Sequence, residues 1–324
     1  MGAKGYIARR AAQSVVTIFV VAVLMFVLFR LMPGDPTAVA LSPALDESVQ
    51  QEMARQYGLN QPLHIQFIRY MASVVTLDFG YSFFQNEPVR DILMRRIGNT
   101  LLLMGTGLLL AYAFGTSIGA LAAWKRGSFD TRVLVSAVLF RSTPVFWLAL
   151  VLLYVFGFHL EWFPIGHMVD AEATYSGFLD KVFSVDFLHH LVLPVLSTVP
   201  FYMAYPLLLM RTTMLRIEGE DFITMAHAKG VRDRDVFAKH AARNSLLPIV
   251  TTAPIVVGLA VAGNVLVETI YSWPGVGRTL VQAVLQSDYP LAQAAFLMIA
   301  VIVIVGNFVA DLLYTVIDPR ITYD

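Results

Sequence analysis

The sequence contains no cysteine and few charged residues, and both features narrow the class of protein. Without cysteine, the chain forms no disulfide and has neither a thiolate nucleophile nor a thiolate metal ligand. Only 14% of its 324 residues are charged, whereas about 25% is usual in soluble domains. This composition excludes an ordinary soluble enzyme, a nucleic-acid-binding protein with a basic face and a disordered chain.

Apolar residues are what the chain has in excess. They make up 57% of the sequence, and the mean hydropathy is +0.66. A soluble protein of this length could not cover so many apolar side chains while offering so few charged ones to water. We therefore expect an integral membrane protein.

Familiar catalytic motifs are absent as well. The sequence has no Gly-x-x-x-x-Gly-Lys-Ser/Thr for nucleotide phosphates, no Gly-x-Ser-x-Gly and no His-Glu-x-x-His. We interpret Gly275-Val276-Gly277 as a turn. His189 and His190 are adjacent, so on a helix their rings point to different faces, which favours an interfacial pair over a metal site. We expect no catalytic residue, no bound cofactor and no metal in this chain.

Six apolar stretches are long enough to cross a bilayer, which predicts an all-α polytopic membrane protein. The first resembles a signal peptide, but its apolar core is longer than the usual roughly 7–15 residues, so we expect an uncleaved anchor. Arg30 at its outer end is expected to extend toward the interface. The predicted spans are Val15–Met32, Leu101–Trp124, Val133–Phe156, Leu191–Met210, Leu246–Ile270 and Leu291–Ile317.

Basic residues predict the orientation of these spans. With the N-terminus in the cytoplasm, the cytoplasmic segments hold more Lys and Arg than the longer external ones, above all between Arg211 and Asn244. Both termini are therefore predicted to be cytoplasmic. The expected parts of the chain are residues 1–32 with the first span, an external helical insertion at 33–98, and a core at 99–324 with five spans and a cytoplasmic segment at 211–244.

The external insertion carries signals for two helices. Asp46 is placed to cap a helix that ends before Gly58, and Pro88 suits the first turn of another. Two placements fit the second helix: at the membrane interface, or packed on the external face of the protein's own bundle. Its apolar residues at helical spacing are Val89, Ile92, Leu93 and Ile97.

The cytoplasmic segment predicts a short helix over Glu220–Lys229. The acidic stretch 218–221 favours its start, because acidic side chains interact with the positive end of the helix dipole. Gly230 suits its end, since glycine readily adopts the left-handed conformation. A second helical segment is predicted over Asp233–Asn244. The short helix either enters a groove on a soluble partner or lies on the bilayer surface, and the apolar residues that it would offer are Phe222, Ile223 and Met225.

This segment carries a resemblance to a known family. Residues 219–231, followed by 242–248, resemble the characteristic cytoplasmic loop of ABC-importer permeases, and more narrowly that of the dipeptide/oligopeptide/nickel branch. Several motifs in the same order along the chain are stronger evidence than any one of them. The others are Pro33-Gly34-Asp35-Pro36, Tyr57–Leu63, Asp78–Ser82, Ser142–Trp147, Glu268–Arg278 and Asp318-Pro319-Arg320.

The resemblance implies a type I ABC-importer-like permease fold in the cytoplasmic membrane of a bacterium or archaeon. It also implies a heterodimer with a second, similar permease, two ATP-binding subunits that hold ATP and magnesium, and an extracytoplasmic solute-binding protein. The chain is then a non-catalytic subunit for import of peptides or peptide-like solutes, with nickel complexes and glutathione among the alternatives for the cargo. Readings from other classes are a stand-alone secondary transporter or channel and a membrane-embedded enzyme.

The resemblance assigns the coupling to the ATPase to the predicted cytoplasmic helix. Where the broader family opens this loop with Glu-Ala-Ala, the chain has Thr224-Met225-Ala226, which leaves the detailed contacts open. The implied coupling residues are Glu220, Asp221, Phe222, Ile223, Thr224, Met225, Ala226, Ala228, Lys229 and Gly230.

Polar and kink-forming residues inside the spans are candidates for the translocation pathway. Arg141 has three readings: it lines the pathway and meets a substrate carboxylate, it extends to the cytoplasmic interface, or it pairs with Glu268 or Asp311. The candidate pathway residues are Arg141, Pro144, Phe146 and Asn264.

Overall fold

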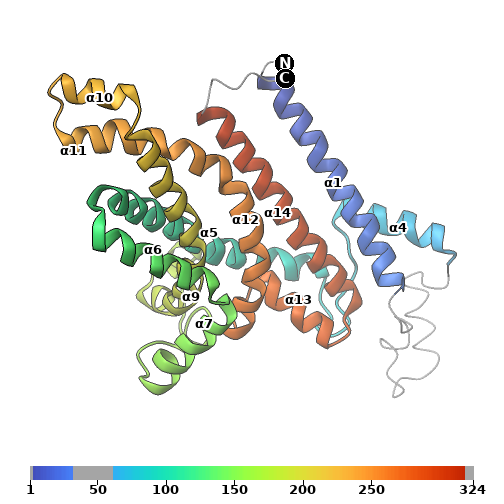
Figure 1. Ribbon diagram of the computed structural model, residues 1–324. Coiled ribbons are helices and arrows are strands. Elements are labelled where there is room, and N and C mark those ends of the chain that lie inside the picture. The colour runs from blue at the N-terminus through green and yellow to red at the C-terminus, as the bar shows by residue number, and fades with distance from the viewer. Residues whose placement is uncertain (1–2, 32–60, 318–324) are drawn as a thin grey trace. The chain divides into compact units, whose positions relative to one another are not determined.

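The computed structural model describes residues 3–31 and 61–317 (Figure 1). Within these residues the regular elements are helices, apart from one isolated antiparallel bridge between Tyr81 and Pro88. In chain order they are α1 (Ala3–Leu31), α4 (Leu63–Thr76), α5 (Val89–Lys125), α6 (Gly127–Ser142), α7 (Val145–Leu152), the π-helix η1 (Leu153–His159), α8 (Phe178–Val182), α9 (Val185–Ile217), α10 (Asp221–Ala228), α11 (Asp233–Asp235), the π-helix η2 (Val236–Ala242), α12 (Arg243–Ile270), α13 (Val276–Leu285) and α14 (Tyr289–Ile317).

Four single helices in the described residues are long and apolar enough to cross a bilayer: α1, α5, α9 and α14. The bent pair α6 and α7–η1 is a fifth candidate span. The predicted span Leu246–Ile270 coincides with the continuous helix α12. An all-helical polytopic membrane protein is thus confirmed, whereas the number of six crossings and the side of the termini stay predictions.

The predicted third span, Val133–Phe156, is wrong as a single helix. The chain leaves the helical conformation at Thr143, whose ψ is 122°, and the helices on either side are bent by 97°. The cause is Pro144, which has no N–H to donate and disfavours the helical conformation of the residue before it.

The predicted short helix after Pro88 is also wrong as a separate element, because it is the first part of α5. Gly98 is too weak a helix breaker to interrupt the run from Val89 to Lys125. Val89, Ile92 and Leu93 are buried against α13 and α14, so of the two predicted placements this apolar face packs on the chain's own helices.

The described chain forms two compact units, and the helices α1, α5 and α14 each contribute to both. Unit 1 contains the described parts of Met1–Ile7, Leu101–Trp273 and Gly306–Asp324, and unit 2 those of Ala8–Thr100 and Pro274–Val305. The division into 1–32, 33–98 and 99–324 follows membrane topology rather than packing and stays a prediction. Outside the described residues lie the expected helix from Asp46 to Gly58, Pro33–Pro36, most of Tyr57–Leu63, and Asp318-Pro319-Arg320.

Unit 1 is built around α9, which packs against α6, α7 and α12. Glycine lets α5 approach it closely: a Cβ at Gly115 would lie 2.7 Å from the carbonyl oxygen of Met203, and one at Gly119 would overlap the carbonyl oxygen of Leu207. The hydroxyl of Tyr271 donates to Ala149 O at 3.0 Å and lies 2.8 Å from Ser197 Oγ, which ties the end of α12 to α7 and α9.

Unit 2 contains α1 from Ala8 onward, α4, the start of α5, α13 and the first part of α14. Phe29 of α1 packs with the apolar face of α5 and with Leu280 and Leu291 of α13 and α14. A buried carboxylate fixes the loop before α5, because Asp288 accepts a hydrogen bond from the hydroxyl of Ser82. These contacts position the cavity that is described below.

Candidate functional site

The predicted cytoplasmic helix is present as α10, within one residue of its expected ends. It begins after Glu220, whose backbone is extended, and it ends at Lys229. Gly230 has a φ of +74°, and the N–H of Val231 then donates to the carbonyl of Ala226 at 3.2 Å. Glycine therefore ends this helix for the reason that the sequence indicated.

The two sides of α10 have different surroundings. Ile223 and Ala226 are buried against Met214 of α9 and Val236 of η2, whereas Phe222 and Met225 are 41% and 57% exposed. The prediction that Ile223 is offered to a partner is therefore wrong. Positions 223 and 226 are three apart and share the inward side, so the apolar residues at 222 and 225 remain for a partner.

The remaining predicted coupling residues are exposed, and several continue the surface formed by Phe222 and Met225. We call this surface the coupling face and define it as Asp221, Phe222, Thr224, Met225 and Ala228, which all lie on one side of the two-turn helix. Glu220, Lys229 and Gly230 are exposed at its ends. Whether these residues contact a partner stays a prediction.

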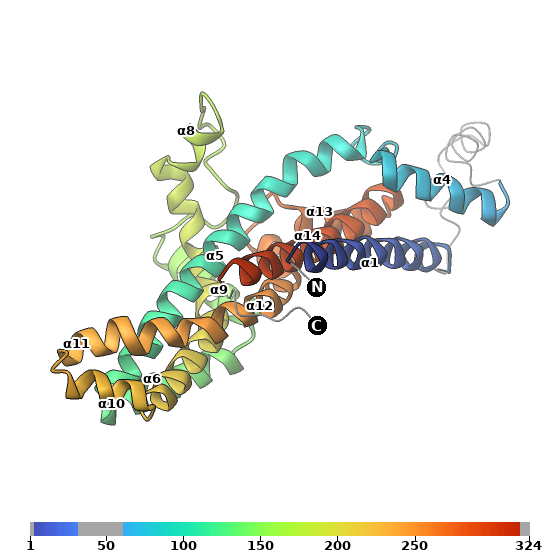
Figure 2. The same ribbon diagram turned by 90° about the horizontal axis from the view of Figure 1, so that it is seen from above.

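Side chains from both neighbouring segments hold α10 in place. Arg126, just after α5, forms an ion pair with Glu218, and the ring of Trp124 lies 4.5 Å from that of Phe237 in η2. Figures 1 and 2 show α10 and α11 alongside each other at one end of unit 1. The segment predicted over Asp233–Asn244 is α11 and η2, which run into α12 without a break.

The pathway candidates lie in different settings within unit 1. Arg141 at the end of α6 is exposed, and its guanidinium carbon lies 4.2 Å from the ring centroid of Phe201 on α9, a cation–π contact. Pro144 and Phe146 are exposed at the break before α7. Asn264 is buried in α12, and its Nδ2 has no hydrogen-bond partner among the described residues. The role of all four stays a prediction.

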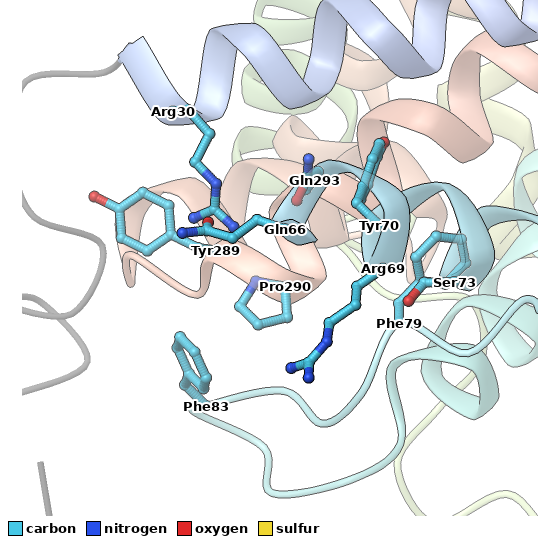
Figure 3. Close-up of a pocket in the computed structure, with 10 residues that line it drawn as sticks. All are labelled: Arg30, Gln66, Arg69, Tyr70, Ser73, Phe79, Phe83, Tyr289, Pro290 and Gln293. Carbon is cyan, nitrogen blue, oxygen red and sulfur yellow. The ribbon is translucent and has the colours of Figure 1, made fainter. Parts of the chain in front are cut away.

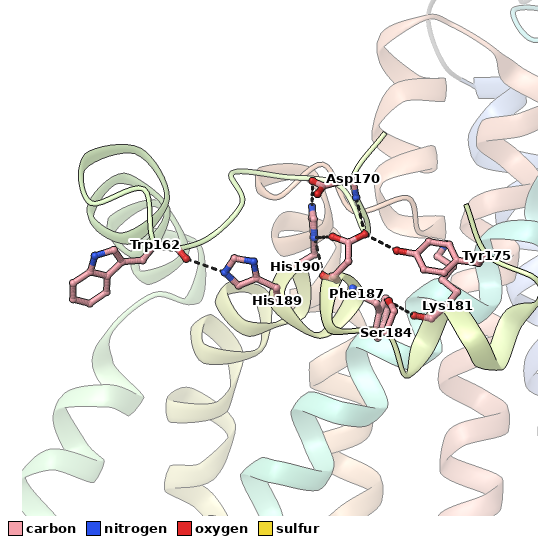
Figure 4. A network of polar contacts seen from close by, with 9 residues as sticks. Trp162, Asp170, Tyr175, Lys181, Ser184, Phe187, His189 and His190 are labelled. Atoms are coloured by element: carbon pink, nitrogen blue, oxygen red, sulfur yellow. Dashed lines mark hydrogen bonds and ion pairs between the residues drawn. The ribbon is translucent and has the colours of Figure 1, made fainter. Parts of the chain in front are cut away.

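The two adjacent histidines point apart, as their spacing predicts (Figure 4). His189 Nε2 lies 2.8 Å from the carbonyl oxygen of Trp162. His190 is buried, and its Nδ1 lies 3.0 Å from Asp186 Oδ1 while its Nε2 lies 3.6 Å from Asp170 Oδ1. The two rings therefore belong to different sets of contacts.

Asp186 is the centre of the network around His190. Its Oδ2 accepts hydrogen bonds from the Tyr175 hydroxyl at 2.5 Å and from the backbone N–H of Asp170 at 3.1 Å. The bond to this carboxylate raises the pKa of Tyr175 because it favours the neutral phenol. Asp170, Asp186 and His190 offer ligand atoms within 4.8 Å of one another, a cluster that the sequence did not indicate because Asp170 lies outside α9, in the loop before α8. The absence of a metal stays a prediction.

Comparison with known families matches almost the whole sequence. Residues 115–323 match the family described as "Binding-protein-dependent transport system inner membrane component". Residues 4–104 match the N-terminal part of the membrane components of such systems. The chain belongs to this family.

Full-length relatives of this membrane component carry transport names. An oligopeptide transport system permease protein of Bacillus subtilis is 34% identical over 98% of this chain and 99% of its own. A di/tripeptide transport system permease protein of Pseudomonas aeruginosa is 36% identical over 98% of both chains. A putative peptide permease protein of Brucella ovis is 39% identical over 92% of this chain and 93% of its own. The predicted resemblance to importer permeases is confirmed, and the chain is a non-catalytic membrane subunit.

The permease also contains a partly buried ion pair that the sequence did not reveal. Arg211 of α9 forms an ion pair through two nitrogens with both carboxylate oxygens of Asp130 in α6. Their side chains are 18% and 16% exposed. In the sequence, Asp130 and Arg211 are only an acidic and a basic residue near the ends of predicted spans. No motif indicates that these two residues, 81 positions apart, form an ion pair.

Proposed function

We propose that the permease is the membrane subunit of an ATP-driven importer for peptides or peptide-like solutes. The observation that carries this proposal is its similarity, over nearly the full length, to relatives named as permeases of oligopeptide and di/tripeptide transport systems. A stand-alone secondary transporter or channel is not favoured, because the family is described by its dependence on a binding protein.

The partners in this proposal follow the organisation of such systems. A second, homologous permease forms the pathway together with this chain, and an extracytoplasmic solute-binding protein delivers the solute. Two ATP-binding subunits bind ATP and magnesium on the cytoplasmic side. Six spans with both termini in the cytoplasm would place α10 on the side of these ATPases, in the cytoplasmic membrane of a bacterium or archaeon.

The coupling face is the proposed contact with one ATP-binding subunit. Phe222 and Met225 lie on the exposed side of a short helix, which is the usual arrangement for a helix that enters an apolar groove of a partner. The opposite side, with Ile223 and Ala226, fastens α10 to unit 1. A displacement imposed on the coupling face is therefore passed to the chain rather than lost in a loose loop.

The buried side of α10 supplies the route by which ATP binding would reach the membrane. Ile223 contacts the group of buried side chains that contains Met214 of α9, Val236 of η2 and Ile249 of α12. We propose that closure of the ATPases moves α10 with the ends of α9 and α12 as one body. ATP binding would then bias one of two packed arrangements of the pathway.

Reconstitution tests this proposal. The purified complex in proteoliposomes should take up a labelled peptide only when ATP, the binding protein and the ATPase subunits are present, and the second permease should co-purify with the chain. Uptake by this chain alone, driven by an ion gradient and independent of ATP, would contradict the proposal and support the stand-alone transporter.

A further inference from the structure

Unit 2 contains a cavity between the end of α1, helix α4 and the start of α14 (Figure 3). Two arginines, Arg30 from α1 and Arg69 from α4, extend into this space beside Pro290. The cavity is also lined by the side-chain amides of Gln66 and Gln293 and by the rings of Phe83 and Tyr289. In the part of the chain that the structure describes, no aspartate or glutamate lines the cavity.

The charges in the cavity favour an anion. Arg30 is half-buried, and its guanidinium carbon lies 5.5 Å from the ring centroid of Phe26. A guanidinium pairs with phosphate or carboxylate through several N–H donors in one plane. Two such groups face one cavity in which no described residue is a carboxylate, so the described lining has positive charge that a ligand can neutralise.

The position of the cavity along the spans indicates where this ligand comes from. Arg30 lies at the end of the apolar span Gly5–Arg30, and Tyr289 begins the span Tyr289–Leu312. Where an apolar span ends, the bilayer passes from hydrocarbon to the headgroup layer. Arg30 is therefore expected at the level of lipid phosphates, whichever side of the membrane this end of unit 2 faces, and Arg69 lines the same cavity.

A second, apolar cavity shares the lining residue Tyr289 with the first. It is lined by Leu28 and Phe29 of α1, Val284 of α13 and Phe296 of α14. Phe296 is about two helical turns beyond Tyr289, toward the middle of the span. Leu28 and Phe296 are 49% and 39% exposed, so this apolar surface opens toward the hydrocarbon.

We propose that unit 2 binds one anionic phospholipid. Arg30 and Arg69 hold its phosphate, Gln66 and Gln293 hydrogen-bond its glycerol headgroup, and an acyl chain lies along Leu28, Phe29 and Phe296. A soluble anion would fill only the polar cavity, and a choline or ethanolamine headgroup would bring a cation for which the described lining offers no carboxylate. This site is separate from the coupling face and does not depend on the identity of the transported solute.

Native mass spectrometry of the detergent-purified complex tests the proposal, with dioleoyl phosphatidylglycerol added in steps. We expect one phosphatidylglycerol to be retained, and its affinity to fall about tenfold in an Arg30→Gln/Arg69→Gln variant, which corresponds to about 1.4 kcal/mol. Arg90→Gln, a change at an exposed arginine of α5 in the same unit, is the matched control and should keep the wild-type affinity.

Further arms distinguish a lipid from a soluble anion. Phe296→Gln should weaken the dioleoyl lipid but not its dihexanoyl analogue, and millimolar glycerol phosphate should not displace the lipid. Equal retention of phosphatidylcholine, full displacement by glycerol phosphate, or an equal loss in Arg90→Gln would overturn the proposal. If the double variant does not assemble, the exposed Arg69→Gln alone must still weaken phosphatidylglycerol more than Arg90→Gln does.

Discussion

Arg211 on α9 and Asp130 on α6 are joined by a two-bonded ion pair, Nε to Oδ1 and Nη2 to Oδ2. Parallel bonds of this kind fix the relative orientation of two groups as well as their distance. The pair lies less than two turns before the end of α9, which leads directly to α10. It therefore braces the part of unit 1 through which a displacement of the coupling face would pass.

Breaking this brace should destabilise the permease. Asp130→Asn leaves the Arg211 charge partly buried without its counter-ion. We expect a loss of about 2 kcal/mol, below the roughly 3–5 kcal/mol for a fully buried pair, since both side chains keep some exposure. Thermal unfolding of the purified complex measures it. Asp235→Asn, at the exposed pair with Lys239, is the control and should cost less than about 1 kcal/mol; similar shifts for both variants would contradict the assignment.

Residues on opposite sides of α10 should respond differently to substitution. Phe222→Asp with Met225→Asp places charge on the coupling face, so ATP-dependent uptake should fall at least about tenfold while membrane insertion and the melting temperature stay unchanged. Normal uptake by this variant in reconstituted vesicles would rule out the coupling face.

The buried side of the same helix supplies the matched comparison. Ile223→Ala removes a side chain that is only 2% exposed and should cost about 2–3 kcal/mol, whereas Phe222→Ala should change stability by less than about 0.5 kcal/mol. Thermal unfolding separates the two. A larger loss in Phe222→Ala than in Ile223→Ala would show that α10 faces the other way.

The close approach of α5 and α9 should tolerate no side chain at Gly115 or Gly119. Gly119→Ala puts a Cβ into the carbonyl oxygen of Leu207, a backbone atom that cannot turn aside, so we expect a loss of about 3 kcal/mol or failure to assemble. Gly105→Ala is the control in the same helix, because no described atom lies within 4 Å of its Cβ, and helix propensity should make it neutral or slightly stabilising. Yields and melting temperatures of the two purified variants provide the measurement.

The network around His190 should bind divalent metal weakly or not at all. Asp170, Asp186 and His190 supply three ligand residues, and Asp186 Oδ2 already accepts two hydrogen bonds, whereas a structural zinc site has four ligands. Micromolar Zn²⁺ should therefore leave the melting temperature unchanged in the wild type. A stabilisation that disappears in His190→Gln but persists in His189→Gln would contradict this prediction.

The parts of the fold that depend on local signals could be predicted from the sequence. Apolar runs indicate spans because hydropathy is a sum over neighbouring residues, and α10 follows from an acidic start and Gly230. The bend at Pro144 could not be predicted from proline alone, because α9 continues through Pro194, Pro200 and Pro206. Packing around each proline decides between a tolerated interruption and a break.

Contacts between residues that are far apart in the chain could not be predicted from the sequence. Apolar side chains occur on both sides of α10, so only the packing of Ile223 against α9 and η2 indicates which side stays exposed. In the same way, Arg30, Arg69 and Tyr289 share a cavity although they come from three helices that are far apart in the chain. Hydropathy indicates where an apolar span ends, but it does not indicate which residues of different helices lie next to one another.

The inward packing of Ile223 and Ala226 gives α10 its shape before any other subunit arrives. A segment that folds only on contact gives up backbone freedom at that moment, at about 1–2 kcal/mol for each residue that becomes ordered. In this permease, the backbone entropy of α10 is lost when unit 1 folds. The ATP-binding subunit proposed for the coupling face would therefore meet a surface that is already folded, and little binding free energy would be spent on ordering it.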